Sequence, residues 1–386
     1  MQLVAYGAQD IYLTGNPQIT FFKVVYRRHT NFSMEAIEQT WNGSSSADGR
    51  CTATISRNGD LVHRMYLELS GGNVASNFAN PGASGLTSVE LEIGGQKIDK
   101  HTGAWMEAWA ELTEPNTSGT TVNANTNMAT GGTLFQRMSC MGGVVQAGAA
   151  PANVFVPLQF WFCRNPGLAL PLIALQYHEV KVILEHTYKT AFTSLSTNKL
   201  WADYIYLDTD ERRRFAQVSH EYLIEQVQEQ TLSTPAGSSE LNFNHPVKEL
   251  IWVVSTGSTK GSGAGFARDG VFDELAGTYQ LKLNGHDRFA ARDYRYFTRT
   301  QVWEHHTGPG GLNSASAGSG KMLDSIAVYS FALKPEEHQP SGTCNFSRID
   351  NAQLVNTGGS TGDLIFAVNY NVLRIMSGMG GLAYSN

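Results

Sequence analysis

Hydrophobic and polar residues alternate along the most regular stretches of this 386-residue chain. In residues 89–93 (VELEI) the aliphatic side chains share one face and the two glutamates the other. A period of two is typical of a β-strand with one buried face. Gly94-Gly95 follows directly, and glycine supplies the positive φ that both central positions of a type I′ turn require. The pattern predicts a β-hairpin.

The same pattern returns close to half the chain length further on. Residues 279–283 (YQLKL) alternate in the same way and lead into Asn284-Gly285. Two further pairs of similar segments keep the same order: 58–69 with 244–254, and 154–162 with 326–333. The repetition predicts two similar all-β domains in tandem. The alternative is that any two all-β halves resemble each other without a duplication.

A charged stretch and one helical pattern interrupt the strands. Residues 208–214 (DTDERRR) form the densest charge cluster and predict the domain boundary. In residues 103–114, Trp105, Trp109 and Leu112 share one face at helical spacing, which predicts a helix packed across a sheet edge. A second helix is expected over 268–277. Stretches rich in Ser, Gly, Thr and Asn are expected as surface loops: 117–132, 255–265, 308–320 and 356–362.

Composition supports a turn-rich β protein. Charged residues make up only 16% of the chain and glycine is frequent, at 39 residues, against about 25% charged residues in typical domains. This excludes a disordered chain and a coiled coil. The net charge of −6 gives no general attraction to nucleic acid, so direct nucleic-acid binding is not expected.

The sequence shows no recognisable secretory signal, metal-binding motif or membrane-spanning segment. The four cysteines are widely spread, without ligand spacing, so neither a disulfide scaffold nor a zinc site is expected. Residues 1–20 carry no Lys or Arg and no continuous apolar core, so no secretory signal is expected. The best apolar run, residues 168–175, is far shorter than the roughly 20 residues that span a bilayer.

Motifs of catalysis do not appear either. His178-Glu179 and His220-Glu221 are not followed by the second histidine of a metalloprotease helix. Glu304-His305-His306 is expected to be an exposed loop. We therefore predict a protein that is not an enzyme, with no catalytic, cofactor-binding or metal-binding residues and no cofactor.

Several long blocks resemble the major capsid proteins of nucleocytoplasmic large DNA viruses, and most closely those of the viruses of chlorella-like algae. The opening block, residues 2–32, begins QLVAYGAQDIYLTGNPQITFFK. The other blocks extend the resemblance to the end of the chain: 55–61, 89–101, 166–180, 203–208, 220–225, 241–246, 339–350 and 369–386.

The resemblance implies an all-β fold of two tandem eight-stranded antiparallel jelly rolls (a double jelly roll), with a few short helices in loops. Residues 1–20 would be an N-terminal arm, 21–210 the first jelly-roll domain and 211–386 the second. Three chains would form a homotrimeric capsomer with a pseudo-hexagonal outline, and capsomers would tile the outer shell of an icosahedral double-stranded DNA virus. The implied location is the virion, with assembly in the host cytoplasm.

The resemblance also implies partners. These are neighbouring capsomers and minor capsid proteins beneath the shell, where the arm is expected to lie, with an inner viral membrane nearby. Because several loops are short for the family, a lower-copy capsid paralogue is an alternative. A carbohydrate-binding or attachment module is another, since jelly rolls also serve as lectins; its stacking residues would be Tyr294, Tyr296, Phe297 and Trp303.

Glycans are the remaining expectation from the resemblance, which places them on outward loops at asparagines outside the usual acceptor rule. The candidates are the Asn-Thr pairs of the polar loops, at Asn116, which also fits the usual rule, and at Asn125 and Asn356. The alternative is unmodified asparagines, which such loops favour because this side chain tolerates turn geometry.

Overall fold

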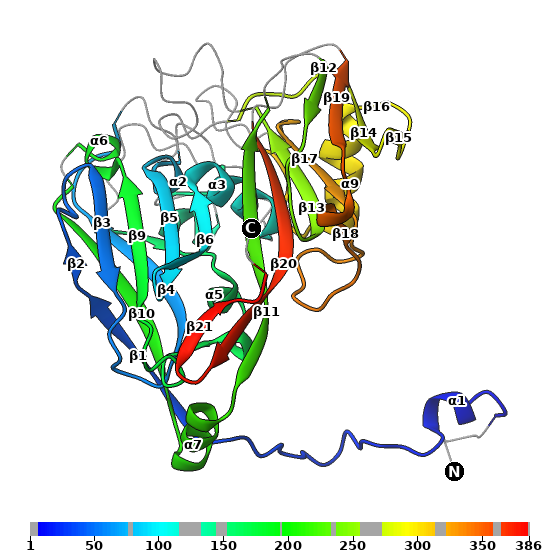
Figure 1. Cartoon of the computed structure of the whole chain (residues 1–386). Coiled ribbons are helices and arrows are strands. Elements are labelled where there is room, and N and C mark those ends of the chain that lie inside the picture. Colours follow the sequence, from blue (N-terminus) through cyan, green and yellow to red (C-terminus); the bar gives the residue numbers. More distant parts are fainter. Residues whose placement is uncertain are drawn as a thin grey trace.

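The strands of the chain form two sandwiches of antiparallel sheets that lie side by side (Figure 1). The computed structural model describes residues 7–75, 80–115, 133–143, 153–193, 195–232, 237–254, 272–312, 322–357 and 364–384. Within these ranges, four sheets are formed, two from each half of the chain.

The first half supplies the first sandwich. One of its sheets has the order β1-β10-β4-β7, with β8 added to β4: β1 Phe32–Gln39, β10 Thr197–Leu207, β4 Leu61–Ser70, β7 Asn153–Pro157 and β8 Leu170–Pro171. The other has the order β2-β3-β9-β5-β6: β2 Trp41–Asn42, β3 Gly49–Thr54, β9 Val180–His186, β5 Leu86–Ile93 and β6 Gln96–Thr102.

The second half supplies the second sandwich. One sheet has the order β11-β20-β13-β17, with β18 on β13 and β21 on β20: β11 His220–Thr231, β20 Leu364–Met376, β13 Pro246–Val253, β17 Ile326–Ser330, β18 Cys344–Asn345 and β21 Met379–Leu382. The other has the order β12-β19-β14-β15, with β16 on β14: β12 Gly237–Glu240, β19 Ala352–Thr357, β14 Thr278–Leu283, β15 His286–Asp287 and β16 Arg292–Asp293.

The two halves have the same topology. When the two-residue additions β2, β8, β16 and β18 and the hairpin strand β21 are set aside, each half orders its eight strands as 1-8-3-6 and 2-7-4-5. This double Greek-key arrangement is the jelly roll. The three pairs of similar segments lie on equivalent strands: β4 with β13, β5 with β14, and β7 with β17. The predicted duplication is confirmed, and the chain is a double jelly roll.

The two predicted hairpin turns are also confirmed at equivalent places. Gly94 and Gly95 have φ of 58° and 85°, and Asn284 and Gly285 have φ of 52° and 76°. Both turns join the fourth and fifth strands of their roll. At Gly94 a side chain is excluded for a second reason, because a Cβ atom there would lie 2.3 Å from the ring of His178.

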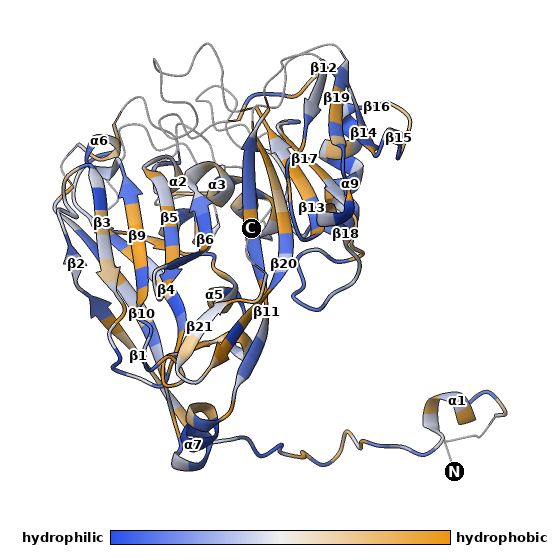
Figure 2. Cartoon of the chain, viewed as in Figure 1, coloured by the Kyte–Doolittle hydropathy of each residue, from blue (hydrophilic) through white to orange (hydrophobic). Residues whose placement is uncertain are grey.

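The alternating residues form the core as predicted. Val89, Leu91 and Ile93 of β5 are fully buried, whereas Glu90 on the opposite face pairs with Lys100 at 3.1 Å. Burying each such aliphatic side chain contributes about 1.5–3 kcal/mol. Apolar and polar residues alternate visibly along these strands in Figure 2.

Helices are short, and two of them matter for the argument: α3 Gly103–Thr113 and α7 Thr209–Gln217. The others are α1 Ile11–Thr14, α2 Pro81–Ser84, α4 Leu134–Ser139, α5 Trp161–Arg164, α6 Tyr188–Ala191 and α9 Gln301–His305, with single turns η1 Pro166–Leu168, η2 Tyr296–Thr300 and η3 Phe346–Arg348. Within the described part of the chain, no helix has the length and apolar character needed to span a bilayer.

Helix α3 was predicted correctly, and α7 occupies the charged stretch between the rolls. The oxygen of the Thr102 side chain accepts the N–H of Trp105 and caps α3, and α7 lies between the end of β10 at Leu207 and the start of β11 at His220. The helix expected over 268–277 is wrong for residues 272–277, where Asp273 forms a β-bridge with Val254. Most of the loops expected from composition lie outside the described residues.

Candidate functional site

The two rolls are joined by a sheet that is buried on both faces. In β13, the side chains of Ile251 and Val253 belong to the hydrophobic core of the first roll, whereas Leu250 and Trp252 belong to that of the second. Residues 247–253 are all buried. This explains why residues 250–254 (LIWVV) form a continuous apolar run instead of alternating, and it makes the rolls one packed unit.

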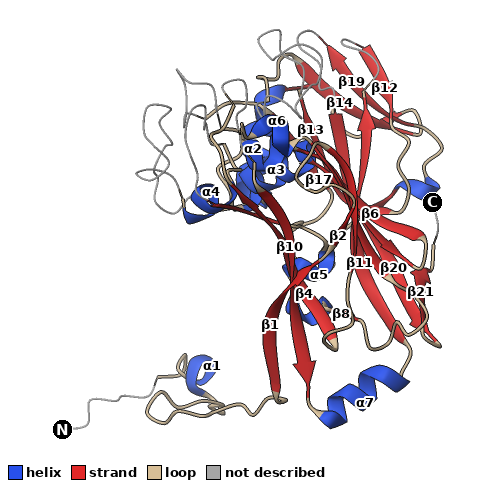
Figure 3. Ribbon diagram, turned by 90° about the vertical axis from the view of Figure 1, so that its left-hand side faces the viewer, coloured by secondary structure: helices blue, strands red, loops and turns tan. Residues whose placement is uncertain are grey.

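Helix α3 lies at this junction, between the two sets of strands (Figure 3). Every residue from Gly103 to Leu112 is buried. The rings of Trp105 and Trp109 stack at 5.0 Å between centroids, and Trp105 lies 5.6 Å from Phe366 of β20. A helix of the first roll therefore packs directly on a strand of the second.

Strand edges add polar contacts across the junction. The backbone N–H of Val227 in β11 donates to Oδ1 of Asp99 in β6 at 3.1 Å. The side-chain amide of Gln226 donates to the carbonyl of Ile98, and Thr102 donates to Glu229 at 2.5 Å. These bonds fix the position of β6 along β11.

A buried carboxylate forms the first charged cluster of the junction. Glu225 of β11 accepts Lys248 at 2.7 Å, Arg164 of the first roll at 2.8 Å and His338 at 3.3 Å. Burial alone would raise the pKa of Glu225, but Arg164, His338 and Lys248 lower it to about 2. Burial lowers the pKa of Lys248, which is held charged by Glu225. Two cations and a histidine thus share one buried carboxylate.

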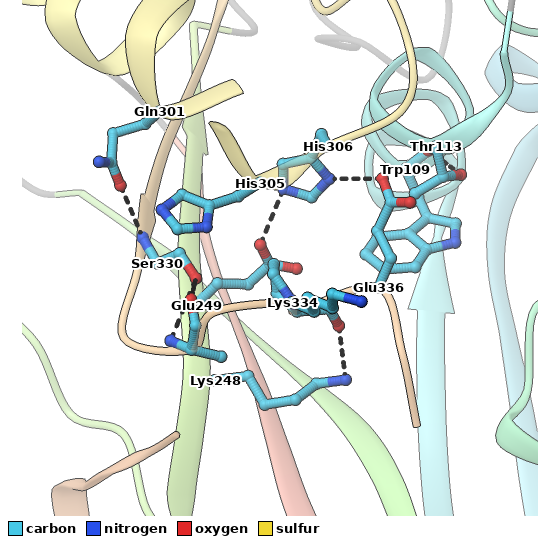
Figure 4. Close-up of polar contacts among 12 residues, drawn as sticks. Trp109, Thr113, Lys248, Glu249, Gln301, His305, His306, Ser330, Lys334 and Glu336 are labelled. Carbon is cyan, nitrogen blue, oxygen red and sulfur yellow. Dashed lines mark hydrogen bonds and ion pairs between the residues drawn. The ribbon is translucent and has the colours of Figure 1, made fainter. Parts of the chain in front are cut away.

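A second cluster surrounds a buried histidine (Figure 4). Nε2 of His306 lies 2.9 Å from Glu249 of β13, and Nδ1 lies 3.0 Å from Glu336. Burial would lower the pKa of His306, but the charge and hydrogen bond of Glu249, followed by those of Glu336, raise it to about 9. With a carboxylate at each ring nitrogen, His306 is an imidazolium cation at neutral pH.

This histidine cluster contacts α3 of the first roll. The His306 ring meets the edge of Trp109 at 6.4 Å between centroids. The adjacent Thr307 donates its hydroxyl to the carbonyl of Thr113 at the C-terminal end of α3, 2.9 Å away. The expectation of an exposed loop at 304–306 is wrong. Glu304 and His305 are the last residues of helix α9, and His306 is buried between Glu249 and Glu336.

The N-terminal segment differs completely from this junction. Described residues 7–31 leave the body beside α7 and run away from it (Figure 1), and nearly all of them are exposed. Their large apolar side chains are strongly exposed, among them Tyr12 at 91%, Phe21 at 89%, Phe22 at 98% and Tyr26 at 85%. Such a concentration of exposed apolar surface is typical of a segment that binds another molecule.

The outer face of the β1-β10-β4-β7 sheet carries a cluster of aromatic side chains. Tyr66 stacks on Trp201 at 6.5 Å and meets Phe155 edge-on at 6.1 Å, while Phe32 and Met34 of β1 remain about half exposed. Each of the three rings stands on a different strand of the sheet. The three rings thus form one aromatic cluster that crosses the sheet.

The structure locates only one of the three candidate glycan sites. Asn116 and Asn125 lie outside the described residues. Asn356 is a residue of β19 and is 6% exposed, with its side-chain amide 3.5 Å from the hydroxyl of Tyr279. The expectation that Asn356 lies in a polar loop is therefore wrong, because the strand continues to Thr357.

The candidate sugar-stacking residues do not form a joint surface. Phe297 is fully buried against Trp252 and Tyr279, and Tyr294 is 8% exposed. Trp303, in contrast, is 82% exposed on α9. Among the described residues, no group of three or more His, Cys, Asp or Glu side chains could hold a metal ion.

The charged residues of the junction were missed in the sequence. The alternation of a strand does not show that Glu225, Lys248 and Glu249 are buried. The residues that pair with these charges lie in distant segments of the sequence. For α3 a signal was present: residues 103–112 (GAWMEAWAEL) are apolar on all sides except for two glutamates, and a helix that is apolar all round is usually buried.

Comparisons with known proteins cover the whole chain. The family model described as major capsid protein N-terminus matches residues 20–208, and the model described as large eukaryotic DNA virus major capsid protein matches residues 211–381. The major capsid protein of Pyramimonas orientalis virus is 53% identical, and that of Paramecium bursaria Chlorella virus 1 is 41% identical; each alignment covers 100% of this chain and 99% of the relative.

Solved structures agree with these relatives. The chain matches a quasi-atomic model of the PBCV-1 virus capsid with a TM-score of 0.73 and 37% identity, over 95% of this chain and 100% of the other. The Faustovirus major capsid protein matches with a TM-score of 0.64, over 96% of this chain and 94% of the other. At 14% identity, this second match shows the shared fold alone.

Proposed function

The chain belongs to the major capsid protein family of large eukaryotic DNA viruses, and we propose that three copies of it form each capsomer of an icosahedral shell. Its role as a structural capsid protein of a large DNA virus follows from relatives that match it from end to end. The proposal adds three points: the trimer, its contacts with neighbouring capsomers, and its contacts with minor capsid proteins beneath the shell.

The main support for the proposed trimer is the presence of two similar jelly rolls, packed together, within one chain. Because both rolls have the topology 1-8-3-6 and 2-7-4-5 and share a sheet buried on both faces, each chain presents two similar wedges at a fixed angle. Three chains then present six similar wedges. A threefold object acquires a nearly hexagonal outline, and hexagons tile a surface.

The aromatic outer face of the β1-β10-β4-β7 sheet supports contact between copies. Tyr66, Trp201 and Phe155 offer rigid aromatic area, a residue type enriched at protein interfaces. Stable interfaces of this class bury about 800 Å² on each partner. We place one subunit contact of the trimer on this face.

The arm supplies contacts beneath the shell. The exposed apolar residues of segment 7–31 are interspersed with Lys23, Arg27 and Arg28, and they fit minor capsid proteins or neighbouring capsomers on the side facing the inner membrane. We propose residues 1–20 as the arm proper, with the first and second domains at 21–210 and 211–386. We further propose assembly in the host cytoplasm and no direct contact with DNA. This role requires no catalytic group, and we assign none.

Molar mass and imaging of the purified chain test the trimer. Light scattering after gel filtration should give three times the 42.1 kDa chain mass, and electron microscopy should show hexagonal particles. A Trp201→Glu variant should shift the mass towards one chain without loss of secondary structure. A wild-type protein that runs as a monomer at micromolar concentration would contradict the proposal.

Abundance in purified particles distinguishes the principal shell protein from a lower-copy paralogue. We propose the principal shell protein, because the relatives at 53% and 41% identity both carry that description over their full length. Quantitative mass spectrometry of particles should therefore find this chain in large excess over every other capsid protein. A low copy number would favour the paralogue.

A further inference from the structure

Helix α3 carries two carboxyl groups that lie inside the protein. Glu107 is 0% exposed and Glu111 is 3% exposed, and their spacing of four residues places them on the same side of the helix. Glu107 accepts the backbone N–H groups of Gly142 at 3.0 Å and Gly143 at 2.7 Å. Glu111 accepts the N–H of Leu312 at 2.7 Å. Each carboxyl group therefore stands where it affects the protonation of the other.

Two buried carboxyl groups this close on one helix repel each other when both are ionised, and one proton on the pair removes this repulsion because a protonated carboxyl can donate to its neighbour. No Lys, Arg or His among the described residues forms an ion pair with either carboxyl. Burial, followed by the charge of Glu107, raises the pKa of Glu111 well above its ordinary value. Burial also raises the pKa of Glu107, while the amides of Gly142 and Gly143 favour its charged form.

The charged groups around α3 are engaged elsewhere. On the side of the second roll, His306 and Glu336 bind each other. Arg164 of α5 lies over the ring of Trp109, 5.1 Å from its centroid, and binds Glu225. Glu114, just beyond the C-terminal end of the helix, is only partly buried. None of these described groups neutralises the two carboxyls.

The pair lies where segments of both rolls meet. Besides the bond from Leu312 to Glu111, Gly308 donates to the carbonyl of Leu112 at 2.7 Å and Gly310 to that of Glu111 at 3.1 Å. Space is so limited that a Cβ on Gly308 would lie 2.5 Å from the Glu111 carbonyl oxygen, and a Cβ on Gly143 would lie 2.6 Å from Cβ of Leu312. The segment 308–312 of the second roll is thus clamped on α3.

We propose that Glu107 and Glu111 share one proton and form a pH-sensitive lock that holds segment 308–312 of the second roll on helix α3 of the first. At neutral pH, Glu111 is protonated and donates to Glu107, whose negative charge is held by the amides of Gly142 and Gly143. Removing the proton leaves two negative charges one helical turn apart in the interior. The lock then opens and lets water reach the pair.

The direction of the pH dependence follows from proton counting. When the segment opens, both carboxyls are hydrated and ionise at ordinary acidic pKa values, whereas the closed pair retains one proton to much higher pH. Opening therefore releases a proton, and its equilibrium constant rises about tenfold per pH unit from above pH 5 up to the raised pKa of the closed pair. Above that pKa it becomes constant.

Hydrogen exchange of the full-length protein measures this opening. The probes are the amides of Gly308, Gly310 and Leu312, followed from pH 6 to pH 9 with correction for the intrinsic exchange rate. In the wild type, protection of these amides should fall by roughly tenfold per pH unit. In Glu111→Gln, the neutral amide still donates to Glu107 and accepts from Leu312, so protection should not depend on pH.

A matched control separates this effect from a general loss of stability. Glu240 is an exposed glutamate of β12, and Glu240→Gln should retain the wild-type pH dependence. Infrared spectroscopy is the second measurement, and it serves even if Glu111→Gln fails to fold. The wild type should show a protonated-carboxyl band at neutral pH, and this band should disappear in the pH range where protection of segment 308–312 stops falling. An absent band, or equal pH dependence in wild type and Glu111→Gln, would overturn the proposal.

Discussion

Arg164 of the first jelly roll and Glu225 of the second form an ion pair, with 2.8 Å between guanidinium nitrogen and carboxylate oxygen and Glu225 only 4% exposed. Lys248 binds the other oxygen of the same carboxylate at 2.7 Å. One carboxylate thus forms ion pairs with two cations that come from different rolls. A buried arrangement of this kind adds little net stability compared with an apolar core, but it makes incorrect relative positions of the rolls costly.

Removing the charge of Glu225 should destabilise the chain strongly. In Glu225→Gln, Lys248 and Arg164 lose their counter-charge inside the protein, and breaking a buried pair in this way costs about 3–5 kcal/mol. Denaturant unfolding measures the loss. The control is Glu38→Gln, which breaks the exposed pair with Lys199 and should cost less than about 1 kcal/mol. Equal effects of the two substitutions would contradict the assigned role of the junction.

Acid should weaken the same cluster in a defined interval. The pKa of Glu225 is about 2 in the folded chain, against an ordinary value of 4.5, so the unfolded chain binds the proton first as pH falls. Its contribution, on the order of 3 kcal/mol, is complete above pH 4.5 and is lost between pH 4.5 and pH 2. Unfolding free energies measured across this interval should fall less steeply in Glu225→Gln than in the wild type.

Alkali should weaken the His306 cluster. Because the pKa of His306 is about 9 when folded and 6.5 otherwise, its stabilisation is complete below pH 6.5 and is lost as pH rises towards 9. The amount lost is on the order of 3 kcal/mol. His306→Gln should flatten this part of the stability profile, whereas the exposed His286→Gln should leave it unchanged. A profile that falls equally in His306→Gln would refute the assignment.

The sequence allowed prediction of those features that depend on local pattern. Gly94-Gly95 and Asn284-Gly285 specify their turns through backbone conformation alone, and helix α3 follows from the spacing of its tryptophans. The partners of His306 could not be predicted, since Glu249 and Glu336 lie far from it along the chain. Asn356 was misplaced because polar composition signals a loop even where a strand continues.

The buried central sheet shows a second feature that the sequence indicates only in part. The run LIWVV at 250–254 breaks the alternation that Met65, Leu67 and Leu69 keep in the equivalent strand of the first roll. A continuous apolar run is typical of a strand buried on both faces. The sequence thus carried a sign of the junction between rolls, but only the three-dimensional arrangement identifies which roll covers the second face.

Glycans, where particle-derived protein carries them, should be found on Asn116 or Asn125 and not on Asn356. Asn356 is 6% exposed in β19 and hydrogen-bonded to Tyr279, so a sugar there would force the strand out of its sheet. Intact mass spectrometry compares the particle protein with the bare 42.1 kDa chain, and glycopeptide mapping locates any added mass. A sugar on Asn356 would contradict the structure, and the bare mass would exclude glycosylation altogether.

The N-terminal arm should be needed for assembly of the shell but not for folding. The apolar side chains of residues 11–26 are exposed, and the described hydrogen bonds of residues 7–30 are all local. Deleting residues 1–20 therefore removes little from the core, and we expect the melting temperature of the deleted chain to stay within a few degrees of wild type. Trimers should still form, because the proposed contact face begins with β1 at Phe32.

Shell assembly should fail in the same deletion, because capsomers would lose their contacts with proteins beneath them. Electron microscopy of particles from cells that express only the deleted chain measures this outcome. Phe21→Ser with Phe22→Ser tests the exposed residues directly after the arm, since it keeps the length and charge of segment 7–31 while removing its two most exposed phenylalanines, at 89% and 98%. Assembly at wild-type yield in this variant would refute the role given to the arm, and loss of folding in the deletion would instead make the arm part of a core.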